Sequence, residues 1–200
     1  MGLEITIVSG LPRSGTSLMM QMLAGGGVQV VTDHLRPPDA DNPRGYYEFE
    51  KVKQIKQDAS WLPEMRGKAL KVVSPLLYEL PLGERYRIIF MERDLDEILV
   101  SQEKMLARRG RSPPPREVLK RSYTLHLRRL RQWLGRQPHM RVLRVSYHQL
   151  ISQPGREANR VCEFLGGKPD ADAMAASVDP ALYRSKSNAP PTAISTGDRN

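Results

Sequence analysis

The sequence predicts an α/β protein in which a central parallel sheet lies between two layers of helices. Three observations support this prediction. Short β-branched runs alternate with segments of helical period, a glycine-containing turn joins the first run to the first helix, and 40% of the 200 residues are hydrophobic. Such a chain is long enough for one domain with a sizeable core. We therefore expect a single three-layer domain over residues 1–184.

Short apolar runs predict five buried strands. They are residues 4–9 (EITIVS), 28–32 (VQVVT), 68–76 (KALKVVSPL), 86–93 (YRIIFMER) and 141–147 (RVLRVSY). The first two, with the helix between them, predict a βαβ unit. Because strands alternate with helices along the chain, the sheet should be parallel, with helices on both of its faces.

Apolar spacing and end signals predict the helices. They are residues 16–26, 94–109, 116–135 and 154–166, the last with a proline near its start and Gly166 at its end. Two loops, residues 35–48 and 108–116, are rich in proline, glycine and charge. Loops of this kind often border the ligand crevice at the carboxyl ends of parallel strands.

Composition limits the environment and the partners of the protein. No apolar run approaches the roughly 18 residues of a membrane span, and the first residues do not resemble a signal peptide. The single cysteine, Cys162, forms no internal disulfide, so we expect a reducing, cytoplasmic location. Residues 185–200 have little to bury and predict a disordered tail.

The net charge of +9 indicates an anionic ligand. In RSYTLHLRRLRQWLGR, residues 121–136, arginines fall between apolar positions. This pattern favours a solvated helix face over a nucleic-acid surface. The four histidines are scattered, so no metal site is predicted.

The stretch SGLPRSGTSLMM, residues 9–20, predicts a phosphate-binding loop. Gly10, Gly15 and Ser17 occupy the positions that G-x-x-x-x-G-K-[ST] requires, but Thr16 stands in place of the lysine. Backbone N–H groups at the start of a helix form an anion site, and the hydroxyls of Thr16 and Ser17 would add donors. Arg13, followed by Ser14, is the nearest residue able to replace the missing positive charge. The sequence therefore predicts a P-loop-type fold.

The loop resembles the 5′-phosphosulfate-binding loop of the sulfotransferases that use 3′-phosphoadenosine 5′-phosphosulfate (PAPS). It is closer to the P-R-S-G-T-T form of the tyrosylprotein branch than to the P-K-S-G-T form of the cytosolic branch. The stretch ERDLDEILVSQ supplies Arg93 and, eight residues later, Ser101, which resemble the family's ligands of the 3′-phosphate. The late segment RVLRVSYHQL also resembles the family. The resemblance implies PAPS as donor and covers residues 4–184.

The same resemblance implies catalytic candidates. Arg13 and Lys71 would hold the transferring group, Lys71 standing where the cytosolic branch has the lysine of K-T-H. The histidine of that motif is replaced by Val73. The tyrosylprotein branch uses a glutamate shortly after the second strand, and Asp33 or His34 matches its place.

Glu48 is a third candidate base, because burial can raise the pKa of a carboxyl group enough for general base catalysis. Asp33 lies at the predicted mouth of the crevice, and it is the carboxylate whose replacement we expect to lower activity. The resemblance thus predicts transfer of a sulfuryl group to a hydroxyl or amine acceptor, with no membrane span.

Two alternatives remain open from the sequence. A P-loop kinase would use ATP and Mg²⁺, with Glu92 near the metal, but the missing lysine argues against it. A module that binds a nucleotide or a nucleic acid without turnover is the third reading, prompted by the missing third-strand histidine and the short chain.

Overall fold

A sheet of four parallel strands lies at the centre of the computed structural model, which describes residues 3–39 and 42–179. The strand order is β2-β1-β3-β4. The strands are β1 (Ile5–Gly10), β2 (Ala69–Val73), β3 (Tyr86–Glu92) and β4 (Met140–Ser146). Because all strands run the same way, their carboxyl ends meet at one edge, where Gly10 pairs with Val73 on one side and Met91 on the other.

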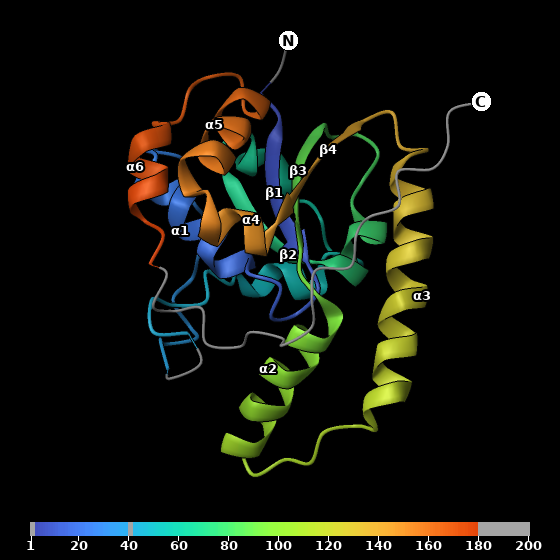
Figure 1. Ribbon diagram of the computed structural model, residues 1–200. Coiled ribbons are helices and arrows are strands. Elements are labelled where there is room, and N and C mark those ends of the chain that lie inside the picture. The colour runs from blue at the N-terminus through green and yellow to red at the C-terminus, as the bar shows by residue number, and fades with distance from the viewer. Residues whose placement is uncertain (1–2, 40–41, 180–200) are drawn as a thin grey trace, which may run out of the picture.

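Helices cover both faces of the sheet (Figure 1). One face carries α1 (Thr16–Gly25), α4 (Tyr147–Ser152), α5 (Pro154–Phe164) and α6 (Ala171–Ala176). The other face carries α3 (Arg116–Leu134) and the 3₁₀ helices η1 (Glu50–Gln54), η2 (Leu62–Met65) and η3 (Ser74–Glu79). Helix α2 (Leu95–Arg108) follows β3 and projects away from the sheet (Figure 1).

The core has two halves, one on each side of the sheet. All six residues of β1 are buried. Because side chains of a strand alternate between faces, Ile7 joins the cluster beneath α3 and the 3₁₀ helices, and Val8 joins the cluster beneath α1 and α5. Strands buried on both faces need continuous apolar runs, which is why β1 and β3 could be found in the sequence.

The predicted α/β class, with a parallel sheet between helices, is confirmed. The predicted strand at residues 28–32 is wrong: only Val30 forms an isolated bridge, with Ala69 on the outer side of β2. The physical reason lies at both ends of the segment. The N–H of Val28 is bonded to the carbonyl of Leu23 at the end of α1, and the N–H of Asp33 is bonded to the carbonyl of Glu48. Too few residues remain between these anchors to form a ladder.

Other differences are smaller. The predicted helix at residues 154–166 ends at Phe164 in α5, and the short helices α4 and α6 were not predicted. Among the apolar residues of α3, Leu130 and Leu134 are buried, whereas Leu119 and Tyr123 are half-buried. The predicted tail, residues 185–200, and the end of the predicted domain lie outside the described residues.

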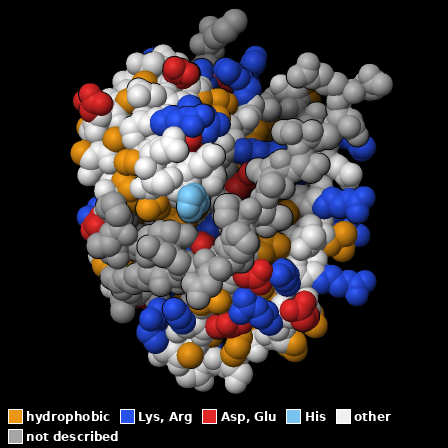
Figure 2. Space-filling view, in the orientation of Figure 1, with side chains coloured by type: hydrophobic (Ala, Val, Ile, Leu, Met, Phe, Trp, Pro, Cys, Tyr) orange, Lys and Arg blue, Asp and Glu red, His pale blue; other side chains and the backbone are white. Residues whose placement is uncertain are grey.

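Positive side chains line the side of the molecule on which α3 lies. Figure 2 shows Lys and Arg side chains along the side on which α3 lies, and a mixture of both charges near α2. On α3, Arg121, Arg128 and Arg129 are exposed. They form the solvated basic face expected from the sequence.

Among the described residues, no helix combines the length and the apolar character that crossing a bilayer requires.

Candidate active site

The turn after β1 requires glycine at two positions. Gly15 has φ +100°, and a Cβ at this position would lie 2.4 Å from Cδ2 of Tyr147. Gly10 has φ +154°, and its Cβ would lie 2.8 Å from the carbonyl oxygen of Met91. Between them Arg13 adopts φ 71°, which is uncommon for a residue with a side chain. The loop is therefore held in a conformation that few other sequences could adopt.

The loop opens directly into the N-terminus of α1. The first turn of α1 contains no acidic residue, and no side chain caps it. The first N–H groups of a helix have no acceptor within the helix, and the helix dipole adds partial positive charge there. Thr16 and Ser17 are the first two residues of this helix, so their backbone N–H groups and hydroxyls lie at an anion-binding position.

Three of the predicted donor-binding residues meet beside this loop. The Nε of Arg13 donates a hydrogen bond of 2.9 Å to Oγ of Ser101 in α2. Arg93, just after β3, donates from Nη1 to the carbonyl oxygen of Arg13 at 3.2 Å. Two segments that lie 80 or more residues from the loop in sequence thus converge on Arg13.

The Arg93 side chain is only 8% exposed and has further partners in the fold. Its Nε lies 2.9 Å from Oε2 of Glu97, and its Cζ lies 4.4 Å from the ring centroid of Tyr147. Burial, with the positive charges of Arg93 and Arg108 nearby, lowers the pKa of Arg13 below its ordinary value. The region is therefore crowded with guanidinium groups, which favours an anionic ligand.

Lys71, on β2, forms a second cluster with two other predicted residues. Its Nζ lies 3.2 Å from Oγ of Ser17 and 3.7 Å from Oε1 of Glu48. Its Nζ also donates to the carbonyl oxygen of Tyr46. Burial lowers the pKa of Lys71 to about 8, although Glu48 opposes this shift. A lysine in the middle of β2 thus reaches the start of α1. Its role near a transferring group stays a prediction.

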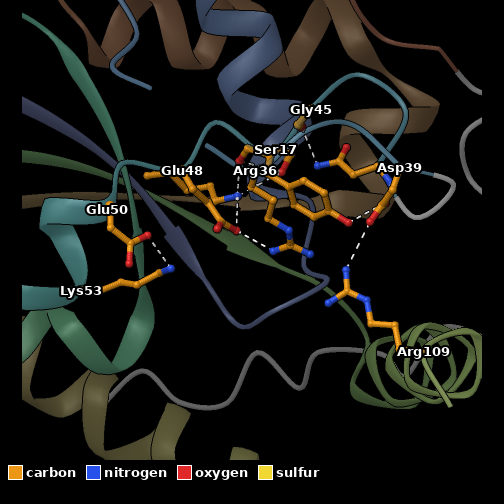
Figure 3. A network of polar contacts seen from close by, with 11 residues as sticks. Ser17, Arg36, Asp39, Gly45, Glu48, Glu50, Lys53 and Arg109 are labelled. Carbon is orange, nitrogen blue, oxygen red and sulfur yellow. Dashed lines mark hydrogen bonds and ion pairs between the residues drawn. The ribbon is translucent and has the colours of Figure 1, made fainter. Parts of the chain in front are cut away.

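Residues 36–39 and 42–48, which we call the strap, approach this second cluster. Figure 3 shows Arg36 and Glu48 pointing toward each other near Ser17, while Arg109 reaches Asp39 from another part of the chain. The Nη1 of Arg36 lies 2.9 Å from Oε1 of Glu48. The carboxylate of Glu48 therefore lies between two cations, Arg36 and Lys71.

Asp33 and His34 lie outside both clusters. The carboxylate of Asp33 accepts hydrogen bonds from the N–H of Leu35 at 3.0 Å and the N–H of Glu50 at 2.5 Å. The bond from Leu35 is the main reason why the pKa of Asp33 is lowered. The exposed His34 has φ 57°, and its N–H is bonded to Thr32. Through these two hydrogen bonds, Asp33 joins Leu35, just before the strap, to Glu50, just after it.

Glu92, the metal-side acid of the kinase alternative, faces arginines. Its Oε1 lies 3.4 Å from Nη2 of Arg131 on α3 and 3.8 Å from Nε of Arg144 on β4.

Ser14, also predicted in the loop, is buried, and its Oγ has no hydrogen-bond partner among the described residues.

Sequence reasoning missed four residues of the site. Tyr46, Arg36 and Asp39 belong to the strap, and Tyr147 packs against Gly15 and Arg93. The signal for Tyr147 was present, because it lies in RVSYHQL, within the late segment that resembles the family. Asp39 and Arg36 had only the composition of their loop as a signal, since their contacts depend on how the loop folds back.

These features together define a class of protein. A glycine-constrained loop leads from a central parallel strand into an uncapped helix N-terminus, and arginines converge on it. This is the architecture of a P-loop-type α/β fold, in which such a helix N-terminus is suited to bind a phosphate group.

The sequence profile of a family described as "Sulfotransferase family" matches residues 48–170, more than half of the chain. The chain therefore belongs to the sulfotransferase family, whose members are enzymes that transfer sulfuryl groups. The predicted placement in the tyrosylprotein branch stays a prediction.

Solved structures share the fold. The sulfotransferase domain of the olefin synthase of Synechococcus PCC 7002 matches with a TM-score of 0.58 at 16% identity, over 96% of this chain and 90% of that one. The sulfotransferase domain of the curacin biosynthetic pathway matches with 0.54 at 15% identity, over 96% and 94%. A sulfotransferase from Alicyclobacillus acidocaldarius matches with 0.50 at 14% identity, over 91% and 89%. No curated protein matches the chain.

Proposed function

We propose that the protein transfers a sulfuryl group from PAPS to a hydroxyl or amine of an acceptor molecule. Family membership supports sulfuryl transfer in general. The observation that carries the choice of donor is the convergence of Arg93 and Ser101 on Arg13 of the loop. A donor with phosphates at both its 5′ and 3′ positions needs two anion sites, and these residues would provide the second one beside the loop.

The loop and the start of α1 would hold the 5′-phosphate end of the donor. Backbone N–H groups at Thr16 and Ser17 are suited to phosphate oxygens, and Gly15 lets the backbone approach closely. Arg93 and Ser101 would hold the 3′-phosphate by charge-assisted hydrogen bonds. An ordinary ATP-dependent kinase has no use for this second site, since ATP lacks a 3′-phosphate.

Transfer itself requires electrostatic stabilisation and removal of one proton. The acceptor oxygen or nitrogen would form a bond to sulfur while the bond from sulfur to the 5′-phosphate oxygen breaks. Arg13 and Lys71 would stabilise the negative charge that develops on the leaving phosphate. Glu48 would accept the proton of the acceptor, and 3′-phosphoadenosine 5′-phosphate would be released.

Glu48 is favoured over Asp33 as the base because of what surrounds each carboxylate. Glu48 lies 3.7 Å from Lys71, so it is next to the groups proposed to hold the reacting atoms. Asp33 already accepts two backbone hydrogen bonds, and a lowered pKa makes a carboxylate a weaker base. No corresponding contact brings His34 to Lys71 among the described residues.

Calorimetry with two nucleotides tests the proposed donor. We expect 3′-phosphoadenosine 5′-phosphate to bind wild-type protein about 10- to 150-fold more tightly than AMP, the equivalent of about 1.5–3 kcal/mol for charge-assisted hydrogen bonds to one phosphate. Ser101→Ala should reduce this preference and leave AMP binding nearly unchanged. Arg66→Ala, which breaks an exposed ion pair with Glu84, is the matched control.

Arg93 needs a paired variant in the same experiment. Arg93→Ala alone would leave Glu97, which is 8% exposed, without one of its cationic contacts, and such a change is strongly destabilising. The double variant Arg93→Ala/Glu97→Gln avoids that buried charge and should lose most of the preference. Equal binding of AMP and the 3′-phosphorylated nucleotide by wild type would refute PAPS as donor. Tightest binding of Mg-ATP would favour the kinase instead.

A further inference from the structure

The backbone carbonyl of Tyr46 lies within the Lys71 cluster. It accepts hydrogen bonds from Nζ of Lys71 and, at 3.4 Å, from Oγ of Ser17. An ammonium group has three N–H bonds to donate, and Ser17, Tyr46 and Glu48 all lie within reach of this one. The groups proposed to hold the transferring sulfuryl group therefore already face an oxygen atom of the chain.

The side chain of Tyr46 is held on two sides. Cζ of Arg36 lies 3.3 Å from the ring centroid, and the hydroxyl donates a hydrogen bond of 2.6 Å to Oδ1 of Asp39. The other carboxylate oxygen of Asp39 lies 3.2 Å from Nη2 of Arg109, the residue after α2. Figure 3 shows this chain of contacts from Arg109 through Asp39 toward Ser17.

We propose that Asp39 is a positioning residue that, through Tyr46, holds the Tyr46 carbonyl in the place of a donor oxygen. This inference rests on the proposed function. Donor binding then requires the Asp39–Tyr46 hydrogen bond to break, so that Lys71 and Ser17 can leave the Tyr46 carbonyl and bind the donor. The strap thereby acts as an internal competitor for the anion site.

The burial of the contacts fits a restraint that can be released. The side chains of Asp39 and Arg109 are 38% and 42% exposed, so water and salt screen their ion pair. Tyr46 itself is only 5% exposed. The Asp39–Arg109 ion pair, which is the weaker contact, therefore lies at the surface, whereas Tyr46, whose carbonyl would block the site, is buried.

Helix α2 connects this restraint to the proposed donor site. Ser101, on α2, contacts Arg13 of the loop, and Arg109 follows the last residue of the same helix. A nucleotide that engages Ser101 would act on the helix that positions Arg109. Contact with the 3′-phosphate and withdrawal of the strap can therefore be linked through one rigid element.

Lys71 provides a readout that does not depend on any nucleotide. Its pKa is lowered to about 8 mainly by burial; Glu48 raises it, and Arg36 and Arg13 lower it. If the strap moves away, water reaches the ammonium group and the pKa should rise toward its ordinary value of 10.5.

The experiment compares Tyr46→Phe and Asp39→Ala, which remove the two partners of one hydrogen bond. Tyr86→Phe is the control, because it removes a tyrosine hydroxyl bonded to the carbonyl of Pro81, near the amino end of β3. Calorimetry should show that both test variants bind 3′-phosphoadenosine 5′-phosphate about threefold to tenfold more tightly than wild type. The double variant should gain no more than Asp39→Ala alone, because Asp39→Ala already removes the contact that Tyr46→Phe removes. Carbon-13 NMR should show the raised pKa of Lys71 in both, and Tyr86→Phe should match wild type.

The outcomes separate the two proposals. Weaker nucleotide binding in Tyr46→Phe, or unchanged binding together with an unchanged Lys71 titration, would overturn the role of Asp39. If no variant binds the nucleotide but the Lys71 pKa still rises, the positioning role stands and the proposed donor is wrong. If wild type binds the nucleotide, Tyr46→Phe and Asp39→Ala both bind it more tightly and Tyr86→Phe matches wild type, both proposals are supported.

Discussion

Glu48, the last residue of the strap, and Asp33, which precedes the strap, are carboxylates with different surroundings. The carboxylate oxygens of Asp33 accept hydrogen bonds from the backbone N–H groups of Leu35 and Glu50. Glu48 lies between the side chains of Arg36 and Lys71 and is therefore part of the charged cluster. The type of residue could be read from the sequence, but the division of roles depends on these contacts.

The first prediction follows from that difference. Glu48→Gln should lower the turnover number by about 10²-fold or more, the scale of general base catalysis, while nucleotide affinity changes little. Asp33→Asn should keep its turnover and show at most a small change in melting temperature. Steady-state rates with PAPS and calorimetry with the product nucleotide measure the two properties separately. Normal turnover in Glu48→Gln together with loss in Asp33→Asn would assign the base to Asp33.

At the scale of elements, the loop and α1 act as one unit. The loop places the start of α1 against β3 and α4, because Gly15 packs directly on Tyr147 and Gly10 packs on Met91. An added Cβ at Gly15 would collide with a buried aromatic ring that also contacts Arg93. The glycine is thus required both for its backbone conformation and for close packing.

Gly15→Ala should therefore lower the free energy of unfolding by about 1–3 kcal/mol, the scale of a residue held in a strained backbone conformation. It should also weaken nucleotide binding, because the loop must shift away from Tyr147. Urea unfolding and calorimetry measure the two effects. Gly155→Ala, on α5, is the matched control: nothing lies within 4 Å of its added Cβ. This variant should be neutral or slightly stabilised. Equal stability of the two variants would contradict the packing argument.

Element prediction succeeded where the apolar pattern alone decides the outcome. Strands β1 and β3 are buried on both faces, so their continuous apolar runs identify them. The run VQVVT carries the same local pattern but forms only the Val30 bridge. Its ends are bonded to α1 and to the strap, and neither contact is visible in a local window of sequence.

At the scale of the whole molecule, burial of Lys71 links stability to pH. Between the folded pKa of about 8 and the ordinary value of 10.5, the unfolded chain holds a proton on this lysine that the folded protein has lost. The unfolded state then binds more protons, so this contribution makes the protein more stable as the pH rises through that window.

The comparison of wild type with Lys71→Met isolates this contribution. Between pH 7 and pH 10, wild type should gain roughly 2–3 kcal/mol of unfolding free energy relative to the variant. Effects of the substitution that do not depend on pH cancel in this double difference. Urea unfolding at the two pH values measures it. An equal pH dependence in the two proteins would mean that Lys71 is well hydrated in the folded state.

The sequence by itself determined the α/β class. It also predicted a phosphate-binding loop with Arg13, and its resemblance to the sulfotransferases implied Lys71, Arg93 and Ser101 as candidates. The class and the loop depend on the apolar period and on glycine positions, and the resemblance depends on short motifs along a strand and the helix that follows it. Local patterns reflect steric and hydrophobic constraints that act within one or two elements.

Only the tertiary structure decided how the candidates are grouped. It brought Ser17, Glu48 and Lys71 together. It placed the carboxylate of Asp33 where backbone N–H groups bind it, and it placed the Tyr46 carbonyl among the groups proposed to hold the donor. The strap lacks a hydrophobic period of its own, so its path is set by long-range contacts such as those of Asp39 with Tyr46 and Arg109. Those contacts join residues up to 70 positions apart, and their free energy exists only once the sheet and its helices have formed.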